Sequence, residues 1–220
     1  DLGADHQLVT VDLPGHGATD AVHDTADLPT AAELLADAGG SAIYVGYSMG
    51  GRIALHAALQ RPETVRGLVL IGATAGLDDP DDRAARREAD EALAERLLTI
   101  GLEAFLDRWL AAPLFAGLSP SAQCRPARLR NRPAGLAASL RHCGTGTQEP
   151  LWDRLSAITA PVLVVAGDDD PKFLAIGERL TATLPDATMR TAPSTHAVHL
   201  ACPTTTAELV RRFAAEHGLD

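Results

Sequence analysis

A serine between two glycines, at the junction of a strand-like run and a helix-like run, constrains the fold of this chain more than any other feature. The apolar run Ala42-Ile43-Tyr44-Val45 precedes Gly46-Tyr47-Ser48-Met49-Gly50, and the helix-like run 51–59 follows. A serine on so tight a turn is held in a strained backbone conformation, and we expect a Cβ on either flanking glycine to crowd the turn. The turn also directs backbone N–H groups of the new helix at the space before the hydroxyl. The sequence therefore predicts an active site centred on Ser48.

Length and composition fit one domain of ordinary size. The chain has 220 residues, of which 46% are hydrophobic, which is enough for a full core. No apolar run approaches the ~20 residues that cross a membrane, and the first six residues lack a basic and then apolar signal pattern. The cysteines, Cys124, Cys143 and Cys202, are odd in number and lack metal spacing. We therefore expect unpaired thiols in a cytoplasmic protein with no membrane span.

The charge balance limits the partners of the chain. Its formal net charge is −10, which argues against nucleic acid, because nucleic-acid binding needs a basic surface. An anionic substrate would have to be attracted by a local cluster of cations. The sequence carries no signal of the oligomeric state.

Short apolar runs alternate with amphipathic ones along most of the chain. The expected strands are 8–11, 42–45, 68–71, 162–165 and, more weakly, 188–192. The expected helices are 30–37, 50–60, 173–184 and 205–217. Strands rich in Val, Leu and Ile that alternate with helices predict an α/β fold with a mostly parallel sheet covered on both faces.

The segment 77–155 breaks this alternation and contains no convincing strand. Asp79-Pro80 is a good helix start, and helical patterns continue to Leu98, over 102–110 and around 134–140. We predict a helical lid insertion over 77–155, between a core segment 1–76 and a core segment 156–220. The alternative is a helical excursion with a structural role alone.

Carboxylates follow one predicted strand and a histidine follows the next. Gly167-Asp168-Asp169-Asp170-Pro171 comes just after 162–165, and His196 comes after 188–192. The carboxyl ends of parallel strands meet at one edge, and the order serine, acid, histidine is the one used with this type of turn. A serine hydroxyl needs such a neighbour to accept its proton. We expect Ser48 and His196 to act together and choose Asp170 among the three carboxylates.

Other readings of these residues stay open. Asp168 or Asp169 is an alternative acid. Three consecutive carboxylates also occur in solvated acidic turns and in weak cation sites. A metal site is the poorer interpretation, because no further ligands recur at useful spacing. His199 rivals His196, although a position sooner after the strand suits a base better. His16, in Pro14-Gly15-His16-Gly17, is read as a turn residue.

Several motifs together resemble a known family. The core motifs are Val11-Asp12-Leu13-Pro14-Gly15-His16-Gly17, Gly46-Tyr47-Ser48-Met49-Gly50-Gly51-Arg52, Gly167 through Phe173, and His196-Ala197-Val198-His199. The insertion adds Arg83-Ala84-Ala85-Arg86-Arg87, Phe105-Leu106-Asp107-Arg108-Trp109, Pro113-Leu114-Phe115 and Leu129-Arg130-Asn131. Over nearly its whole length, the chain resembles the α/β-hydrolase superfamily and, within it, the 2-succinyl-6-hydroxy-2,4-cyclohexadiene-1-carboxylate synthases of menaquinone biosynthesis.

The resemblance implies a lyase that eliminates pyruvate rather than a hydrolase. Ser48, deprotonated through His196, would remove a proton next to the succinyl ketone. Asp170 would orient His196, and the backbone N–H of Met49 would be one oxyanion donor. No metal or organic cofactor is implied.

The resemblance also implies how the substrate, a small tricarboxylate, is bound. Arginine suits carboxylates because its guanidinium donates two parallel hydrogen bonds and stays charged. Arg52 lies one helical turn beyond Ser48 by simple geometry, whereas Arg86 and Arg130 follow from the motif match. The remaining residues implied to line the substrate pocket are Tyr47 and Trp109.

The chain departs from the family pattern in two places. Thr195 replaces the glycine usual before the histidine, and the chain begins after a segment that supplies a second oxyanion donor and a strand between 8–11 and 42–45. We therefore expect an N-terminally shortened form that lacks N-terminal strands of the fold. Two other functions stay open: a carboxylester or C–C bond hydrolase of the same fold acting on a small acidic substrate, and a non-catalytic remnant with an incomplete oxyanion hole.

Overall fold

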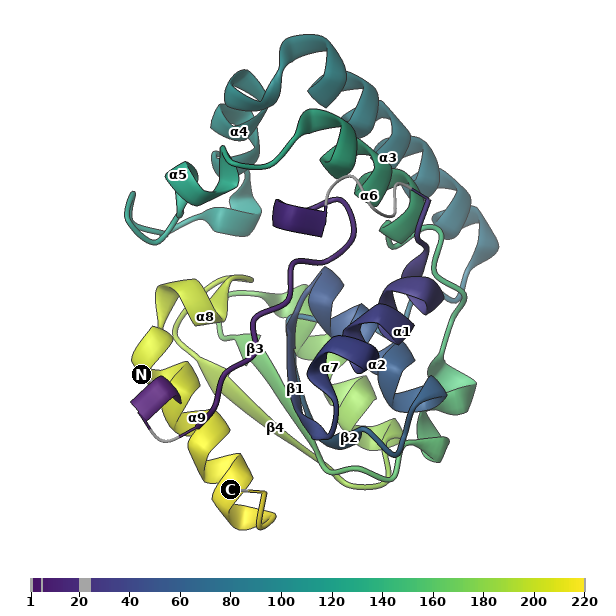
Figure 1. Ribbon diagram of the computed structural model, residues 1–220, viewed down its shortest axis with the longest axis vertical. Coiled ribbons are helices and arrows are strands. Elements are labelled where there is room, and N and C mark those ends of the chain that lie inside the picture. Colours follow the sequence, from purple (N-terminus) through teal and green to yellow (C-terminus); the bar gives the residue numbers. More distant parts are fainter. Residues whose placement is uncertain (1, 5, 20–24, 220) are drawn as a thin grey trace.

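The chain folds as a parallel β-sheet flanked by helices, with a helical layer above one edge of the sheet (Figure 1). The computed structural model describes residues 2–4, 6–19 and 25–219, so Asp1 and Asp5 of the segment searched for a signal pattern lie outside the described residues. The strands, paired in the order β1-β2-β3-β4 and all parallel, are β1 (Ala42–Tyr47), β2 (Val65–Ile71), β3 (Val162–Gly167) and β4 (Ala187–Ala192). The predicted parallel sheet is confirmed.

Helices cover both faces of the sheet. On one face, Leu68 and Leu70 of β2 pack in a core with α1 (Leu28–Gly39), α2 (Met49–Gln60) and α7 (Pro171–Thr183). On the other face, Val69 and Ile71 pack with Val210 and Phe213 of α9 (Pro203–Glu216), next to the short α8 (Val198–Ala201). Because both faces are covered, β2 and β3 are apolar at nearly every position.

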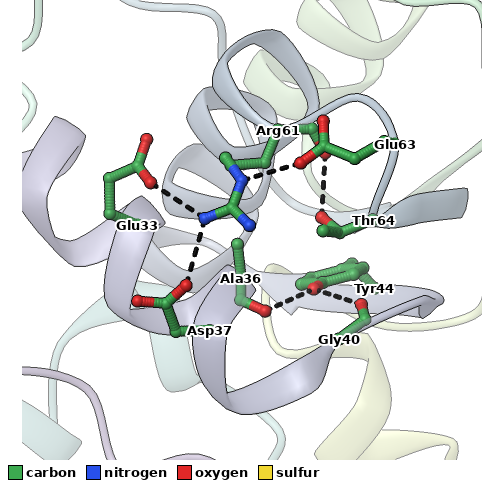
Figure 2. A network of polar contacts seen from close by, with 8 residues as sticks. All are labelled: Glu33, Ala36, Asp37, Gly40, Tyr44, Arg61, Glu63 and Thr64. Carbon is green, nitrogen blue, oxygen red and sulfur yellow. Dashed lines mark hydrogen bonds and ion pairs between the residues drawn. The ribbon is translucent and has the colours of Figure 1, made fainter.

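A polar network joins the end of α2 to α1 (Figure 2). Arg61 donates from Nη1 to Glu33 at 3.2 Å and to Asp37 at 3.0 Å, and from Nε to Glu63 at 2.8 Å. Close by, the Tyr44 hydroxyl of β1 donates to the backbone carbonyl of Gly40, the residue after α1, at 2.8 Å. The ion pairs are largely solvated and add little stability. They connect α1 to the C-terminal end of α2, which is the end opposite to Ser48.

The strand expected at residues 8–11 is wrong. This stretch has no sheet pairing, and Leu8 and Val9 are 53% and 59% exposed. Within the described part of the chain, β1 pairs with β2 alone, and Val45 of β1 is 50% exposed. A strand exists only where a neighbour completes its hydrogen bonds, and residues 8–11 are paired with none of the described strands.

Residues 80–143, the helical part of the segment expected as an insertion over 77–155, form the layer above the sheet edge in Figure 1, whereas Leu151 and Leu155 pack in the core with β2. Asp79 caps the first helix of the insertion by accepting from the backbone N–H groups of Asp81 and Asp82, and Pro80 is the first helical residue, so the expected helix start is confirmed. The insertion contains α3 (Pro80–Ile100), α4 (Leu102–Leu110), η3 (Pro113–Phe115), α5 (Arg125–Arg128), α6 (Pro133–Cys143) and most of η4 (Trp152–Ala157). The remaining short 3-10 turns are η1 (Leu2–Ala4) and η2 (Gly17–Thr19).

The structure places the cysteines and shows the character of the helices. The cysteines Cys124, Cys143 and Cys202 are all unpaired. Among the helices of the described residues, none combines the length and the apolar character that a membrane crossing needs.

Candidate active site

Ser48 lies on the turn between β1 and α2 with a backbone φ of 50°. Left-handed φ values are costly for a residue with a Cβ and persist where the surrounding structure enforces them. A Cβ on Gly46 would lie 2.5 Å from the backbone of Gly50, and one on Gly51 would lie 2.5 Å from the Ala73 Cβ. A Cβ on Gly50 would meet nothing within 4 Å. The expectation of crowding is therefore correct for Gly46 and wrong for Gly50, because the tight approach is at Gly51.

His196 follows β4 and hydrogen-bonds to Asp170, which follows β3. The distance from His196 Nδ1 to Asp170 Oδ2 is 3.2 Å, and the side chains are 3% and 13% exposed. The other Asp170 oxygen, Oδ1, accepts from the Phe173 backbone N–H at 3.2 Å and so caps α7. Asp168 and Asp169 are exposed. Of the three carboxylates, Asp170 is therefore the one in contact with the imidazole.

The surroundings of His196 favour its neutral form. Burial lowers its pKa below the ordinary 6.5, while the charge and hydrogen bond of Asp170 act in the opposite direction. The Phe173 ring lies 4.3 Å from the imidazole, measured between centroids. Gly72, at φ +54°, lies so near that a Cβ there would be 2.8 Å from His196 Cε1. A neutral, tightly packed imidazole with one nitrogen held by a carboxylate is suited to accept a proton at the other nitrogen.

One cavity of about 730 Å³ joins this edge of the sheet to the helical insertion. Ser48 and His196 both line it, from β1–α2 and from the loop after β4. The side chains from the insertion that line it include Arg86, Asp90, Phe105, Trp109, Arg128 and Asn131. A cavity with a serine and a histidine on its floor and helices above is suited to hold a small organic substrate.

Met49 is the first residue of α2 and also lines the cavity. The first N–H groups of a helix have no partner within the helix, so that of Met49 is available to an oxyanion near Ser48. The Met49 side chain accepts a hydrogen bond at Sδ from Ser139 of α6, at 3.4 Å. The turn of Ser48 is thereby in direct contact with the insertion.

Arg52 and Arg86 both reach the cavity wall. Arg52 is 6% exposed and donates to the carbonyls of Cys143 at 2.7 Å and Gly144 at 3.3 Å, at the end of α6. Burial lowers the pKa of Arg52 to about 10, which leaves it charged near neutral pH. Arg86 pairs through Nε with Asp90 Oδ1 at 2.9 Å. Helix-end carbonyls and a carboxylate thus compensate two cations that lie on one cavity with Ser48.

Trp109 lines the cavity, whereas Tyr47 does not. Trp109 stacks on Phe105 with 5.8 Å between ring centroids. Tyr47 packs between the rings of His196 at 5.1 Å and His199 at 4.3 Å, and it lines a second hollow on the α9 side of the sheet. Tyr47 therefore supports the histidine rather than facing the Ser48 cavity.

Sequence and structure comparisons relate the chain to known proteins. Residues 1–209 match the model of the alpha/beta hydrolase family. The chain belongs to the α/β-hydrolase family. Its similar relatives include a protein of Bacillus subtilis (strain 168) named "Putative 2-succinyl-6-hydroxy-2,4-cyclohexadiene-1-carboxylate synthase", 37% identical over 222 residues that cover 95% of this chain and 81% of the relative.

Further relatives carry the same name. The 2-succinyl-6-hydroxy-2,4-cyclohexadiene-1-carboxylate synthase of Serratia proteamaculans (strain 568) is 36% identical, with 96% of this chain and 84% of the relative covered. The solved structure of MenH from S. aureus aligns with a TM-score of 0.88 and 30% identity, over 95% of this chain and 83% of that one.

Two histidines of this α/β-hydrolase that the sequence left open have distinct positions. His199 lies beside the second hollow, and burial, with the charge of Arg128, lowers its pKa to about 4. His16 lines the Ser48 cavity, and its Nδ1 lies 3.1 Å from the Pro14 carbonyl. His199, expected as a pocket wall or a partly exposed residue, therefore lines the second hollow and not the Ser48 cavity.

Of the two arginines expected from the insertion of this α/β-hydrolase, Arg86 lines the cavity and Arg130 does not. Arg130 is exposed and is not among the cavity-lining residues, whereas Arg128, two residues earlier, lines the cavity. Sequence reasoning missed Arg128 and Lys172 as wall residues. Lys172 stands directly after the Asp-Pro pair that follows β3, which was a usable signal, but no pattern in the sequence distinguishes Arg128 from its neighbours.

The described residues contain no cluster of His, Cys, Asp or Glu side chains that could hold a metal ion.

Proposed function

We propose that this α/β-hydrolase is a 2-succinyl-6-hydroxy-2,4-cyclohexadiene-1-carboxylate synthase, a lyase of menaquinone biosynthesis. The reaction eliminates pyruvate from a succinyl-enolpyruvyl-hydroxycyclohexene-carboxylate. The observation that carries the proposal is the presence of Arg52 and Arg86 on the same cavity as Ser48 and His196. Two cations beside the serine suit a substrate with several carboxylates, and the relatives with this name cover most of the chain.

In the proposed mechanism, neutral His196 accepts the Ser48 proton and Ser48 acts as the base. Ser48 removes a proton from the carbon next to the succinyl ketone, and the electron pair moves onto the carbonyl oxygen as an enolate. When the enolate re-forms the ketone, the electrons pass through the ring and break the C–O bond to the enolpyruvyl group. That group leaves as the enolate of pyruvate and is protonated to pyruvate.

The other residues act on charge that develops during this sequence. The backbone N–H of Met49 donates to the enolate oxygen at the start of α2, where the helix dipole also favours negative charge. Asp170 holds His196 by the 3.2 Å contact and stabilises its protonated form. The helical insertion 77–155 acts as a lid that excludes water while the carbanion-like intermediate exists.

Hydrolysis of a carboxylester is the second candidate, because a serine, a histidine and a carboxylate serve acyl transfer as well. The two candidates differ in the reaction that the bound substrate undergoes. A neutral ester gains nothing from guanidinium groups, whereas a small acidic ester and the lyase substrate both carry carboxylates that these groups could bind.

The experiment that separates the two functions compares substrates in wild type and Arg52→Ala. Pyruvate release is followed with the succinyl-enolpyruvyl substrate, and ester hydrolysis is followed with p-nitrophenyl acetate. We expect kcat/KM for pyruvate release to fall by about 10- to 100-fold in the variant, the loss of a charge-assisted contact, while any ester hydrolysis changes far less. Equal losses on both substrates, or ester hydrolysis faster than pyruvate release in wild type, would favour the hydrolase.

A further inference from the structure

His16 lines the Ser48 cavity but is not used by the proposed proton transfer. The loop that carries it, just before η2, is held firmly in place. A Cβ on Gly15, at φ +81°, would lie 2.3 Å from a backbone oxygen of α6, so the loop packs backbone against backbone on that helix. The backbone N–H of Gly17 donates to Asn131 Oδ1 at 2.9 Å. The position of the imidazole is therefore set by the helical insertion as well as by its own turn.

The surroundings of His16 determine which ring nitrogen carries the hydrogen. Nδ1 lies 3.1 Å from the Pro14 carbonyl oxygen, which can only accept, so the hydrogen is on Nδ1. Burial lowers the pKa of His16 below the ordinary 6.5, against the opposing effects of the Pro14 carbonyl and the Asp12 charge, so the ring is neutral near pH 7. Nε2, the ring nitrogen farther from the backbone, is then an acceptor with a free lone pair. Among the residues that the structure describes, none donates a hydrogen bond to it.

Most other polar side chains of the described cavity wall are cations or already have partners. Asn131 accepts through Oδ1 from the loop that holds His16, and its Nδ2 donates to the Arg128 backbone carbonyl at 2.9 Å. Asp90 accepts from Arg86 through Oδ1, and its Oδ2 is fully buried. The cationic side chains of the wall are those of Arg52, Arg86, Arg128 and Lys172. His16 therefore places an uncharged acceptor in a wall whose other side chains mainly donate.

We propose that His16 Nε2 accepts a hydrogen bond from the ring hydroxyl of the substrate and so selects hydroxylated rings. The inference rests on the proposed function, in which the cyclohexene ring carries a hydroxyl besides its carboxylates. A lone pair on neutral imidazole attracts a hydroxyl hydrogen and repels a carboxylate oxygen, so this one side chain distinguishes the two kinds of substituent. The product of the proposed reaction keeps the hydroxyl, so the contact persists from substrate to product. His16 is thus a binding residue that sets specificity and takes no part in proton transfer.

The first experiment isolates the hydroxyl with a pair of ligands and does not depend on lyase turnover. Ser48 is labelled with a fluorophosphonate, and the protecting ligand is either cyclohexanecarboxylate or 2-hydroxycyclohexane-1-carboxylate, the latter as the cis and as the trans isomer. In wild type we expect half-protection at a concentration about 3- to 10-fold lower with the better hydroxylated isomer than with cyclohexanecarboxylate, the effect of one hydrogen bond. In His16→Leu this preference should disappear, and in His16→Gln, which keeps an acceptor, part of it should remain.

His142→Leu is the matched control, since His142 belongs to α6 but does not line the cavity, and it should keep the wild-type preference. Equal unfolding temperatures show that the variants fold. The absence of a preference in wild type, or the same preference in wild type and His16→Leu, would overturn the hydroxyl site.

The second experiment measures pyruvate release in the same variants. Because the contact is made equally in the ground state and the transition state, we expect KM to rise about 3- to 10-fold in His16→Leu with kcat changed far less, and His16→Gln to recover part of the loss. Pyruvate release with a wild-type KM in His16→Leu would overturn the hydroxyl site and leave the lyase function standing. A preference for the hydroxylated ligand that depends on His16, without any pyruvate release, would reject the lyase function and leave the hydroxyl site standing.

Discussion

Ser48 has a backbone conformation that the residues around it enforce, and this conformation directs its hydroxyl toward the cavity edge of the sheet. Its positive φ of 50° is tolerated because Gly46 and Gly51 let α2 pack directly against β1 and the loop after β2. His196 is held by Asp170 on one side and by Phe173 on the other. At the scale of single residues, the proposed chemistry depends on the Asp170 contact more than on any other.

Replacing Asp170 with Asn tests that dependence. Asn cannot stabilise a protonated imidazole and favours the wrong tautomer, so we expect kcat for pyruvate release to fall by roughly 10³–10⁴. The neutral imidazole acts as base, so activity falls as the pH drops through the His196 pKa, which lies below 6.5. The carboxylate raises that pKa, so its removal should move the acidic limb of the kcat/KM profile to lower pH. Asp169→Asn, a change at an exposed carboxylate next to it, is the control; a wild-type profile in Asp170→Asn would contradict the assigned role.

At the scale of elements, the sequence predicted the helices and strands whose signal lies within their own residues. The strand at 162–165 was found because both faces of the sheet are covered there, so its apolar run is unbroken. The strand at 42–45 was found from its apolar run, although Val45 is exposed. The start of α3 was found because Asp79 and Pro80 act within one helical turn. The run 8–11 has the same composition as a strand but forms none, because a strand depends on a neighbour that its own residues do not reveal.

The same distinction between local and distant information applies to the site. Ser48, Asp170 and His196 could be proposed from sequence because each follows a strand, and the ends of parallel strands meet. Arg128 and Arg130 could not be told apart. Which of them faces the cavity depends on the short helix α5, which begins after Cys124 in a left-handed conformation at φ 51°. No sequence rule marks a cysteine for that conformation.

At the scale of the whole molecule, the carboxyl edge of the sheet and the helical insertion enclose the site between them (Figure 1). The core beneath holds His56 of α2, which is 6% exposed and whose Nε2 has no hydrogen-bond partner among the residues that the structure describes. Burial, together with the charges of Arg154 and Arg52, lowers the pKa of His56 to about 4. The folded chain therefore carries an uncharged histidine that the unfolded chain would protonate near pH 6.

This difference predicts how stability depends on pH. Between about pH 6.5 and 4 the unfolded state binds a proton at His56 that the folded state does not, so the free energy of unfolding falls as the pH falls. The effect of this one residue is at most about 3–4 kcal/mol, since one pKa unit corresponds to about 1.4 kcal/mol and the pKa of His56 falls from 6.5 to about 4. In His56→Leu, the free energy of unfolding measured with urea should fall less steeply between pH 6.5 and 4 than in wild type. Above pH 7, the difference in this free energy between the two proteins should be constant. Parallel curves for the two proteins down to pH 4 would show that His56 takes no part.

The release of pyruvate from the succinyl-enolpyruvyl substrate tests the account most directly. With purified protein we expect one pyruvate for each substrate consumed, and in Ser48→Ala a rate lower by roughly 10³-fold or more, because the base is gone. Wild-type protein that releases no pyruvate, or a Ser48→Ala variant that releases it at the wild-type rate, would contradict the claim that Ser48 eliminates pyruvate in this cavity.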